Sequence, residues 1–311
     1  MSNMNSGSPQ TKVGSAPGAV NTATQSALTQ QSPAGSKPPA MDRPRIVVIM
    51  PAFNAAKTLE KTHGELPKDI VDRVILVDDA SEDDTPQIAR RLGLDVVVHM
   101  QNKGYGGNQK TCYIEALKAD ADIIVMVHPD NQYDATRIPD LVRPIIEGRA
   151  DLVLGSRLLY GRKATLQGGM PIWKYISNRF LTKVENMVFG THLSEAHTGF
   201  RAYSRRLLCT IPFLLNSDDF VFDSEVIAET VAFGFKIAEV PVPTRYFPEA
   251  SSVNFRRSVI YGLSTLNVAR KFLLHKLGIR KYPIFSKRLY EVLSREYRER
   301  ICGDHGQDTK Q

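Results

Sequence analysis

Short apolar runs alternate with helical patterns through the first half of the chain. The runs occupy residues 46–50, 73–77, 94–99, 123–127 and 151–154. They lack the polar alternation of a half-exposed strand, which predicts strands buried on both faces, as in parallel sheets. Helical patterns between them cover residues 55–66, 84–92, 106–119 and 136–147. This alternation predicts an α/β fold built on a doubly wound, mostly parallel sheet.

The regular alternation of apolar runs and helical patterns ends after Gly155. Helical patterns cover 172–189 and 222–233, and extended segments are expected at 198–203 and 236–242. Residues 259–277 then form an amphipathic pattern whose apolar side is broad. Such a side suits packing on the core or on another subunit, and it also suits a membrane surface.

Composition divides the chain into three parts. Residues 1–41 are rich in Ser, Gln, Pro and Gly and almost uncharged, which predicts a disordered tail. The main domain is expected at 42–250, and 251–311 would be a basic, amphipathic helical extension. Between residues 255 and 300 there are twelve Lys or Arg against three Glu. This surplus fits either a solvated helical face or attraction to anionic lipid headgroups, and it carries no motif for nucleic acid.

The cell compartment is predicted from cysteines and from apolar segments. Cys112, Cys209 and Cys302 are odd in number and share no metal-ligand spacing, which favours reduced thiols. No stretch of about 18 apolar residues or apolar signal segment is present. We therefore expect a cytoplasmic protein, and any contact with the cytoplasmic face of a membrane would be peripheral.

Polar side chains follow two of the predicted strands. Asp78 and Asp79 come directly after the second apolar run, and the segment 51–54 follows the first. In an open parallel sheet the carboxyl ends of the strands face one crevice, where ligands bind. Asp79 and Ser81 could simply shape a turn. The DDxSxD spacing at this place favours acceptors for a nucleotide.

A second cluster, His128, Asp130 and Gln132, follows the fourth run. Alternate residues of an extended chain point the same way, so these three side chains are expected to converge on one ion. Imidazole, carboxylate and amide ligands suit a divalent metal that holds a diphosphate. A histidine alone would more often be structural.

Glycines and arginines complete the candidate set. Gly104 lies in the glycine-rich segment 102–108 before a helix, where backbone N–H groups can approach an anion, although a tight turn explains it equally well. Arg157, Arg201 and Arg245 follow later strands or loops. Guanidinium groups beside such a crevice could clamp phosphate in a bidentate way, or they could be surface charges.

Taken in order, these motifs resemble those of the inverting family 2 glycosyltransferases, which have the GT-A fold. The likeness runs from about Arg45 to Arg257, through PAFNAAKTL, VDDASEDDT, NKGYGGNQ, HPDNQYD, GSR, HTGFRAYS and EVPVPTRY. It is most similar to the branch that transfers mannose or glucose to dolichyl or polyprenyl phosphate. The resemblance implies a GT-A domain at 42–250 with a Rossmann-like nucleotide-binding half, followed by an acceptor-side segment.

The resemblance also implies roles for individual residues. The nucleotide sugar would be bound by Pro51, Phe53, Asn54, Asp78, Asp79, Gly104 and Arg245. The metal, Mn²⁺ or Mg²⁺, would be bound by His128, Asp130 and Gln132. The catalytic residues would be Asp130, Arg157 and Arg201, and Glu195 stands near the family's acidic position ahead of the GFR element.

The chain departs from the family pattern at two places. His128 stands where the first aspartate of the metal motif is expected. The lysine that often follows the EVP strand is absent from Ser251-Ser252-Val253, so Arg256 or Arg257 would have to substitute. Imidazole suits Mn²⁺ better than Mg²⁺.

The function expected from these motifs is inverting transfer of a sugar from a GDP- or UDP-linked donor to a lipid phosphate. An ionised phosphate acceptor needs no strong base. A glycan hydroxyl acceptor would need one, and Asp219, Asp223 or Glu225 could supply it, although the same segment can be the start of a helix. A non-catalytic nucleotide-sugar-binding protein is the other alternative. A nucleotidyltransferase would want a glycine- and arginine-rich loop after the first strand, which PAFN does not supply.

Overall fold

The computed structural model describes residues 43–161, 165, 169–245, 255–294 and 301. The tail expected at 1–41 and the segment 251–253 lie outside the described residues.

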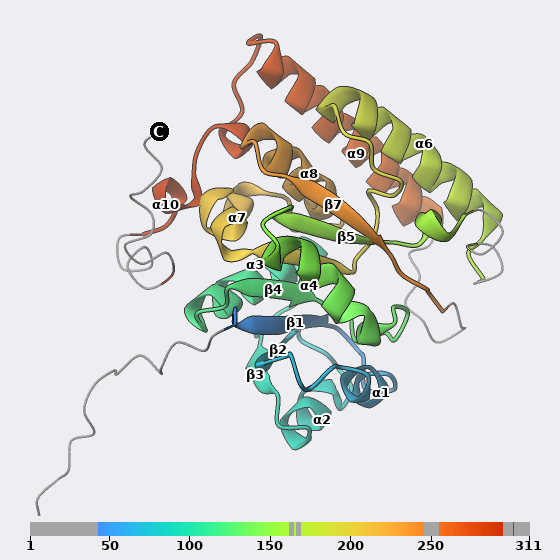
Figure 1. Cartoon of the computed structure of the whole chain (residues 1–311), viewed down its shortest axis with the longest axis vertical. Coiled ribbons are helices and arrows are strands. Elements are labelled where there is room, and N and C mark those ends of the chain that lie inside the picture. Colours follow the sequence, from blue (N-terminus) through green and yellow to red (C-terminus); the bar gives the residue numbers. More distant parts are fainter. Residues whose placement is uncertain (1–42, 162–164, 166–168, 246–254, 295–300, 302–311) are drawn as a thin grey trace, which may run out of the picture. The chain divides into compact units, whose positions relative to one another are not determined.

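A seven-stranded sheet forms the centre of the protein (Figure 1). Its strands are β1 (Ile46–Ala52), β2 (Arg73–Asp78), β3 (Asp95–Val98), β4 (Ile123–Met126), β5 (Leu152–Ser156), β6 (Arg201–Ser204) and β7 (Ile237–Pro241). Their spatial order is β3-β2-β1-β4-β6-β5-β7. Only β6 runs antiparallel to its neighbours, β4 and β5, among the strand pairs described. The predicted doubly wound, mostly parallel sheet is confirmed.

Helices cover both faces of this sheet. One face packs against α1 (Leu59–Gly64), α2 (Thr85–Arg91) and α4 (Ile138–Ile146). The other face packs against α3 (Gly104–Lys118), α7 (Arg205–Thr210), α8 (Phe222–Ala232), α9 (Phe255–Lys276) and α10 (Leu289–Val292). Along β1, Val47 and Ile49 face one core while Ile46, Val48 and Met50 face the other. Two buried faces explain why the strand sequences are continuously apolar.

The two longest helices, α6 (Ile172–Phe189) and α9, lie side by side beyond the β5–β7 edge of the sheet (Figure 1). Val268, Ala269 and Phe272 of α9 belong to the same core as strands β1 and β5. The amphipathic helix expected at 259–277 therefore begins four residues earlier, at Phe255, and its inner side packs on the main domain. Among the described helices, none is both long and apolar enough to cross a membrane.

Candidate active site

The loops after β1 and β2 are tied together by side chains of the DDxSxDDT motif. Ser81 Oγ accepts a hydrogen bond from the Asn54 amide at 2.8 Å, and Thr85 Oγ1 accepts one from the Ala55 amide at 2.8 Å. Asn54 is in the left-handed region, with φ at 51°, and its Oδ1 accepts from the Glu82 amide at 2.9 Å. The loop is thus held in one conformation. It buries Pro51 and leaves the Phe53 ring 53% exposed at the strand edge.

Asp78 retains an unused acceptor at this edge. Its carboxylate is fully buried at the end of β2, and Oδ2 accepts a hydrogen bond from the Ser81 amide at 3.0 Å. Oδ1 is buried without a hydrogen-bond partner. Since a buried carboxylate oxygen is costly without a donor, this atom favours a ligand that brings one. The prediction that Asp78 binds the nucleotide is compatible with this geometry.

Asp79 holds the loop that precedes α3. Its Oδ1 accepts from the Lys103 amide at 2.8 Å and pairs with His99 Nδ1 at 2.7 Å, and its Oδ2 accepts from the Gly104 amide at 3.1 Å. Both oxygens are therefore used to fix the loop before α3. Because a carboxylate oxygen can accept more than one hydrogen bond, these contacts give Asp79 a structural role while its binding of the nucleotide stays a prediction.

The glycine-rich loop also serves the fold. Gly104 donates its amide to Asp79, and the amides of Gly106 and Gly107 donate to the Asp218 carbonyl at 2.8 and 3.4 Å. The α3 N-terminus is thus closed by protein oxygens and offers no anion cradle at these positions. These contacts favour the tight-turn alternative for Gly104, and its binding of the nucleotide sugar stays a prediction.

Gly104→Ala should lower the free energy of unfolding by about 1–3 kcal/mol, because alanine is strained in the left-handed region. Gly104 has φ at 84°, and an added Cβ would lie 2.6 Å from the Asp218 carbonyl oxygen. Gly64→Ala is the matched control, since nothing lies within 4 Å of its Cβ position and its φ is ordinary. Urea denaturation of both variants measures the difference. Equal stability of the two would contradict this account.

The HPDNQ segment does not continue β4 as an extended chain. The strand ends at Met126, and the chain turns at 129–131 with Asn131 at φ 53°. The expectation that three alternate side chains point the same way is therefore wrong. His128 stacks on Tyr105 with ring centroids 5.6 Å apart, and a Cβ on Gly199 would lie only 2.7 Å from its ring. Burial lowers the pKa of His128, which keeps the imidazole neutral.

Asp130 has the geometry of a ligand. Its Oδ1 accepts from the Gln132 amide at 3.1 Å, and no described residue donates to Oδ2. Burial raises the pKa of Asp130, although His128 and nearby amides oppose this. Arg245 lies next to this turn, since its amide donates to the Gln132 carbonyl at 2.8 Å and its Nη1 donates to Glu65 at 2.6 Å. The positive side chain of Arg245 and the negative side chain of Asp130 thus both lie near the end of β4.

Asp130 and its neighbours fit a divalent ion that is also coordinated by the phosphates of a bound substrate. No group of three or more His, Cys, Asp or Glu side chains in the described part of the chain could hold an ion by itself. Mg²⁺ is commonly bound by one or two carboxylates together with substrate phosphates. Asp130 Oδ2 meets that requirement. His128 Nε2 lies 3.3 Å from the Tyr105 hydroxyl, so its role as a ligand stays a prediction, as does that of Gln132.

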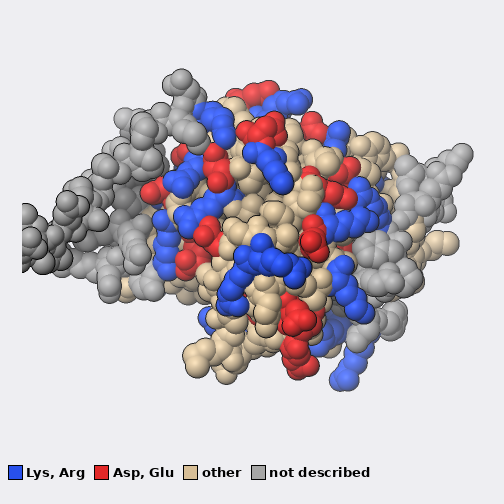
Figure 2. Space-filling model, turned by 90° about the horizontal axis from the view of Figure 1, so that it is seen from below, with Lys and Arg blue, Asp and Glu red and all other residues tan. Residues whose placement is uncertain are grey.

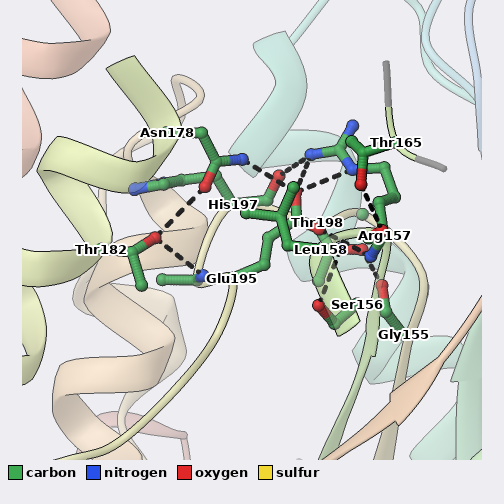
Figure 3. A network of polar contacts seen from close by, with 12 residues as sticks. Gly155, Ser156, Arg157, Leu158, Thr165, Asn178, Thr182, Glu195, His197 and Thr198 are labelled. Atoms are coloured by element: carbon green, nitrogen blue, oxygen red, sulfur yellow. Dashed lines mark hydrogen bonds and ion pairs between the residues drawn. The ribbon is translucent and has the colours of Figure 1, made fainter. Parts of the chain in front are cut away.

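Arg157 is bound to Glu195 (Figure 3). Its Nε and Nη2 donate to Glu195 Oε1, its amide donates to Oε2 at 2.7 Å, and Nη2 also donates to the His197 carbonyl at 2.7 Å. Asn178 of α6 donates to Glu195 Oε1 from the other side at 2.8 Å. A bidentate clamp on phosphate by Nε and Nη2 would break this buried pair, which is costly. Direct catalysis by Arg157 stays a prediction.

Arg201 is a structural cation. It is fully buried, and its guanidinium donates to the carbonyls of Thr198 at 2.7 Å, Asp223 at 3.1 Å and Ala196 at 3.1 Å. Its Nη1 also lies 3.5 Å from Asp223 Oδ1. Contact with a substrate is incompatible with this arrangement. The predicted catalytic role of Arg201 is therefore corrected to that of holding the HTGFR segment against α8.

The acidic residues of segment 219–225 do not have the surroundings of a general base for a hydroxyl acceptor. Asp223 accepts from the Tyr105 hydroxyl at 2.9 Å and from Gln109 at 3.3 Å, in addition to pairing with Arg201. Glu225 Oε2 accepts from the Ser217 amide at 2.7 Å, and burial raises its pKa. Both belong to the first turn of α8, as in the helix-start alternative. Asp219 is exposed and accepts from the neighbouring Phe220 amide.

Two residues beneath the site were missed from the sequence. Tyr105 links His128 to Asp223 through its hydroxyl, and His99 links Asp79 to Thr111 Oγ1 at 2.9 Å. Tyr105 could have been found because it is the aromatic residue inside the glycine-rich motif. No signal in the sequence marks His99.

Comparison with known proteins identifies the family. The family model described as Glycosyl transferase family 2 matches residues 47–211. An uncharacterised protein of Methanocaldococcus jannaschii is 32% identical over 66% of this chain and 84% of its own length. The UDP-N-acetylglucosamine–dolichyl-phosphate N-acetylglucosaminyltransferase of Methanococcus voltae is 28% identical over 65% of this chain and 86% of its own. The undecaprenyl-phosphate mannosyltransferase of Micrococcus luteus is 27% identical over 64% and 82%.

A solved structure supports the fold. Glucosyl-3-phosphoglycerate synthase from Mycobacterium tuberculosis, in complex with phosphoglyceric acid, superposes with a TM-score of 0.57 at 22% identity, covering 76% of this chain and 81% of that one. Other crystals of that protein contain Mn²⁺ with UDP-glucose, or Mg²⁺ with UDP. The match of the family model to more than half of the chain, together with this likeness of fold, shows that the chain belongs to the family 2 glycosyltransferases and is a sugar-transferring enzyme with the GT-A fold.

Proposed function

We propose that this enzyme transfers a sugar, with inversion, from a GDP- or UDP-linked donor to a polyprenyl or dolichyl phosphate at the cytoplasmic face of a membrane. The observation that carries the proposal is the arrangement at the carboxyl edge of β1, β2 and β4. The unpaired Asp78 oxygen and the exposed Phe53 ring lie on one side, and Asp130 with Arg245 on the other. The two relatives named as lipid-phosphate glycosyltransferases support this acceptor class.

The donor nucleotide would lie between the β1 and β2 loops. Phe53 offers an apolar surface to a base, while Asp78 Oδ1 would accept from a base or ribose donor. Asn54 is held by Ser81 and Glu82, so its position is fixed before the donor binds. A loop that is already held in one conformation reduces the ordering that binding would otherwise cost.

Asp130 and Arg245 would hold the diphosphate end of the donor. A divalent cation bound there, Mn²⁺ or Mg²⁺, would neutralise charge that develops on the leaving diphosphate. Asp130 would contribute its free carboxylate oxygen, and the neutral His128 imidazole is the second candidate ligand. Arg245 is 42% exposed and can reorient from Glu65 towards a phosphate.

The acceptor phosphate would attack the anomeric carbon from the face opposite the leaving group. A bond then forms between phosphate oxygen and carbon as the bond to the diphosphate breaks, which inverts the centre. Because the phosphate is already ionised near neutral pH, no side chain has to remove a proton. The absence of a required base agrees with the structure, in which Asp223 pairs with Arg201 and Glu225 accepts from the Ser217 amide. The enzyme would act by alignment and by stabilising charge.

Two measurements test the proposal together. In a thermal-shift screen of GDP- and UDP-sugars, we expect one donor to raise the melting temperature only with Mn²⁺ or Mg²⁺ present, because a ligand that binds the folded state stabilises it. The same donor, radiolabelled and incubated with a short polyprenyl phosphate, should give an acid-labile lipid product. Transfer only to soluble glycans would overturn the acceptor assignment, and binding without any turnover would favour the non-catalytic alternative.

A further inference from the structure

Helix α6 exposes large apolar side chains on its outer side. Its inner side buries Asn178, Thr182 and Glu185, at 9%, 3% and 1% exposed, together with the apolar Leu181 and Phe189. Its outer side exposes Ile172, Ile176, Phe180 and Met187, at 61%, 60%, 59% and 74%. The helical repeat of 3.6 residues places these two sets on opposite sides. A water-soluble surface helix shows the opposite arrangement, so the outer side of α6 is suited to an apolar environment.

Helix α9 extends the same apolar surface. It lies alongside α6, and a Cβ added at Gly262 would lie 3.7 Å from the Leu181 side chain of that helix. Val259, Ile260 and Leu263 near its start are exposed, as is Leu277 just after its end. We call these residues, together with Ile172, Ile176, Phe180 and Met187, the α6–α9 face.

The charge of the two helices is almost entirely positive. Their basic residues are Lys174, Arg179, Lys183, Arg256, Arg257, Arg270, Lys271 and Lys276. Glu185 is the sole acidic residue within α6 and α9 as described, and it is buried. The opposite end of the molecule, near β3 and α2, instead intersperses both signs (Figure 2). Ion pairs such as Arg91–Glu60 belong to that end.

We propose that the α6–α9 face docks on the surface of an anionic lipid bilayer. Apolar side chains interspersed with cations, without exposed acids, are the chemistry that binds a headgroup layer and its acyl boundary. The same charges argue against a second copy of this chain, because two such faces would bring like charges together. The membrane contact predicted for residues 255–300 is thereby extended to α6. The exposed apolar side chains of α6 are the stronger evidence for it.

Docking through this face would bring the active site to the lipid phosphate. Asn178 on the inner side of α6 is bonded to Glu195, the partner of Arg157 (Figure 3). Near the start of the same helix, Lys174 lies over the Trp173 ring at 5.5 Å. One helix therefore has its outer side on the proposed membrane and its inner side on the predicted catalytic edge. This benefit rests on the proposed function, whereas the docking itself does not.

Vesicle sedimentation tests the docking without any sugar nucleotide. The full chain should sediment with vesicles of phosphatidylcholine and phosphatidylglycerol, and much less with phosphatidylcholine alone. Ile176→Ser with Phe180→Ser should weaken binding by about tenfold or more, since the apolar area buried is lost. Arg179→Gln with Lys183→Gln should weaken it by about 25-fold at low salt, at about fivefold for each cation.

Matched controls change equally exposed residues elsewhere. Met100→Ser with Ile146→Ser removes two exposed apolar side chains, and Arg91→Gln with Arg143→Gln removes two exposed cations. Both controls should sediment like the wild type. Failure of the wild type to bind anionic vesicles, or equal loss in variants and controls, would overturn the proposal. A dimer in analytical ultracentrifugation that the Ile176/Phe180 variant abolishes would assign the face to a second copy instead.

A separate assay keeps this result distinct from the proposed function. With a short, water-soluble polyprenyl phosphate and no vesicles, the Ile176/Phe180 variant should transfer sugar at the wild-type rate. If the wild type transfers nothing, the proposed function fails while sedimentation still decides the docking.

Discussion

Arg201→Met should lower the free energy of unfolding by about 3–5 kcal/mol, because removing one partner of a buried pair leaves the other charge uncompensated. Methionine cannot replace the bonds to the carbonyls of Thr198, Asp223 and Ala196. For a domain of this size we expect the melting temperature to fall by about 10 °C. Differential scanning calorimetry measures the change.

Arg206→Met is the control for this variant. Arg206 also pairs with an aspartate, Asp151, at 2.8 Å, but its side chain is 70% exposed. The buried Asp151 keeps hydrogen bonds from Ser204 Oγ and the Lys236 amide, so the melting temperature should fall much less than in Arg201→Met. Arg201→Lys should be intermediate, because it keeps the charge but loses the planar set of donors. If Arg201→Met were as stable as Arg206→Met yet inactive, Arg201 would contact substrate and our correction would be wrong.

The centre of the sheet was predictable because strands β1, β4 and β5 are buried on both faces. Continuous apolar runs such as 46–50 leave few alternatives, and the helices between them set the parallel order. Residues 198–203 were expected to be extended, but the antiparallel place of β6 between β4 and β5 depends on contacts distant in sequence. Contacts distant in sequence also make α1 shorter than the helix expected at 55–66. The side chains of Thr85 and Asp83 accept hydrogen bonds from the Ala55 and Ala56 amides and hold these residues in a loop.

The sequence predicted the location of the candidate site better than it predicted the role of each residue in it. Motif residues do gather at the carboxyl edge of the strands, as the sheet geometry requires. Asp79, Gly104 and Arg201 are nevertheless used to hold loops, because their polar atoms have partners on distant segments. Sequence spacing cannot reveal which of two adjacent carboxylates has a free oxygen. That distinction, between Asp78 and Asp79, arises from the position of the 102–104 loop.

The surface of α6 gives a further example. A periodic pattern at 172–189 predicts the helix correctly, but it does not say which side is buried. Asn178 faces inwards because its amide donates to Glu195 there, and Glu185 faces His197, whose Nε2 lies 3.1 Å from its carboxylate. The apolar side is left outside as a consequence. Amphipathicity alone therefore locates a helix, and its neighbours decide what each side meets.

Asp130→Asn should reduce sugar transfer by about 10²–10⁴-fold, equivalent to about 3–5 kcal/mol of lost stabilisation in the transition state. The amide keeps the size of the side chain and can still accept from the Gln132 amide. It loses the negative charge that would hold a divalent ion against the donor diphosphate. Steady-state transfer at saturating donor, measured across a Mn²⁺ titration, gives both the rate and the apparent affinity for the metal.

Asp134→Asn distinguishes this loss from a general effect of changing the segment. Asp134 lies four residues along the same loop, and its Oδ1 accepts from the Thr136 amide at 3.1 Å, a bond that asparagine can keep. We expect wild-type turnover from that variant. Asp130→Asn should also lose the metal-dependent rise in melting temperature with the donor, while its melting temperature without ligand stays near that of the wild type. Full activity of Asp130→Asn, with an unchanged response to Mn²⁺, would mean that the diphosphate is held elsewhere, and Arg245 with its neighbours would then have to supply the charge.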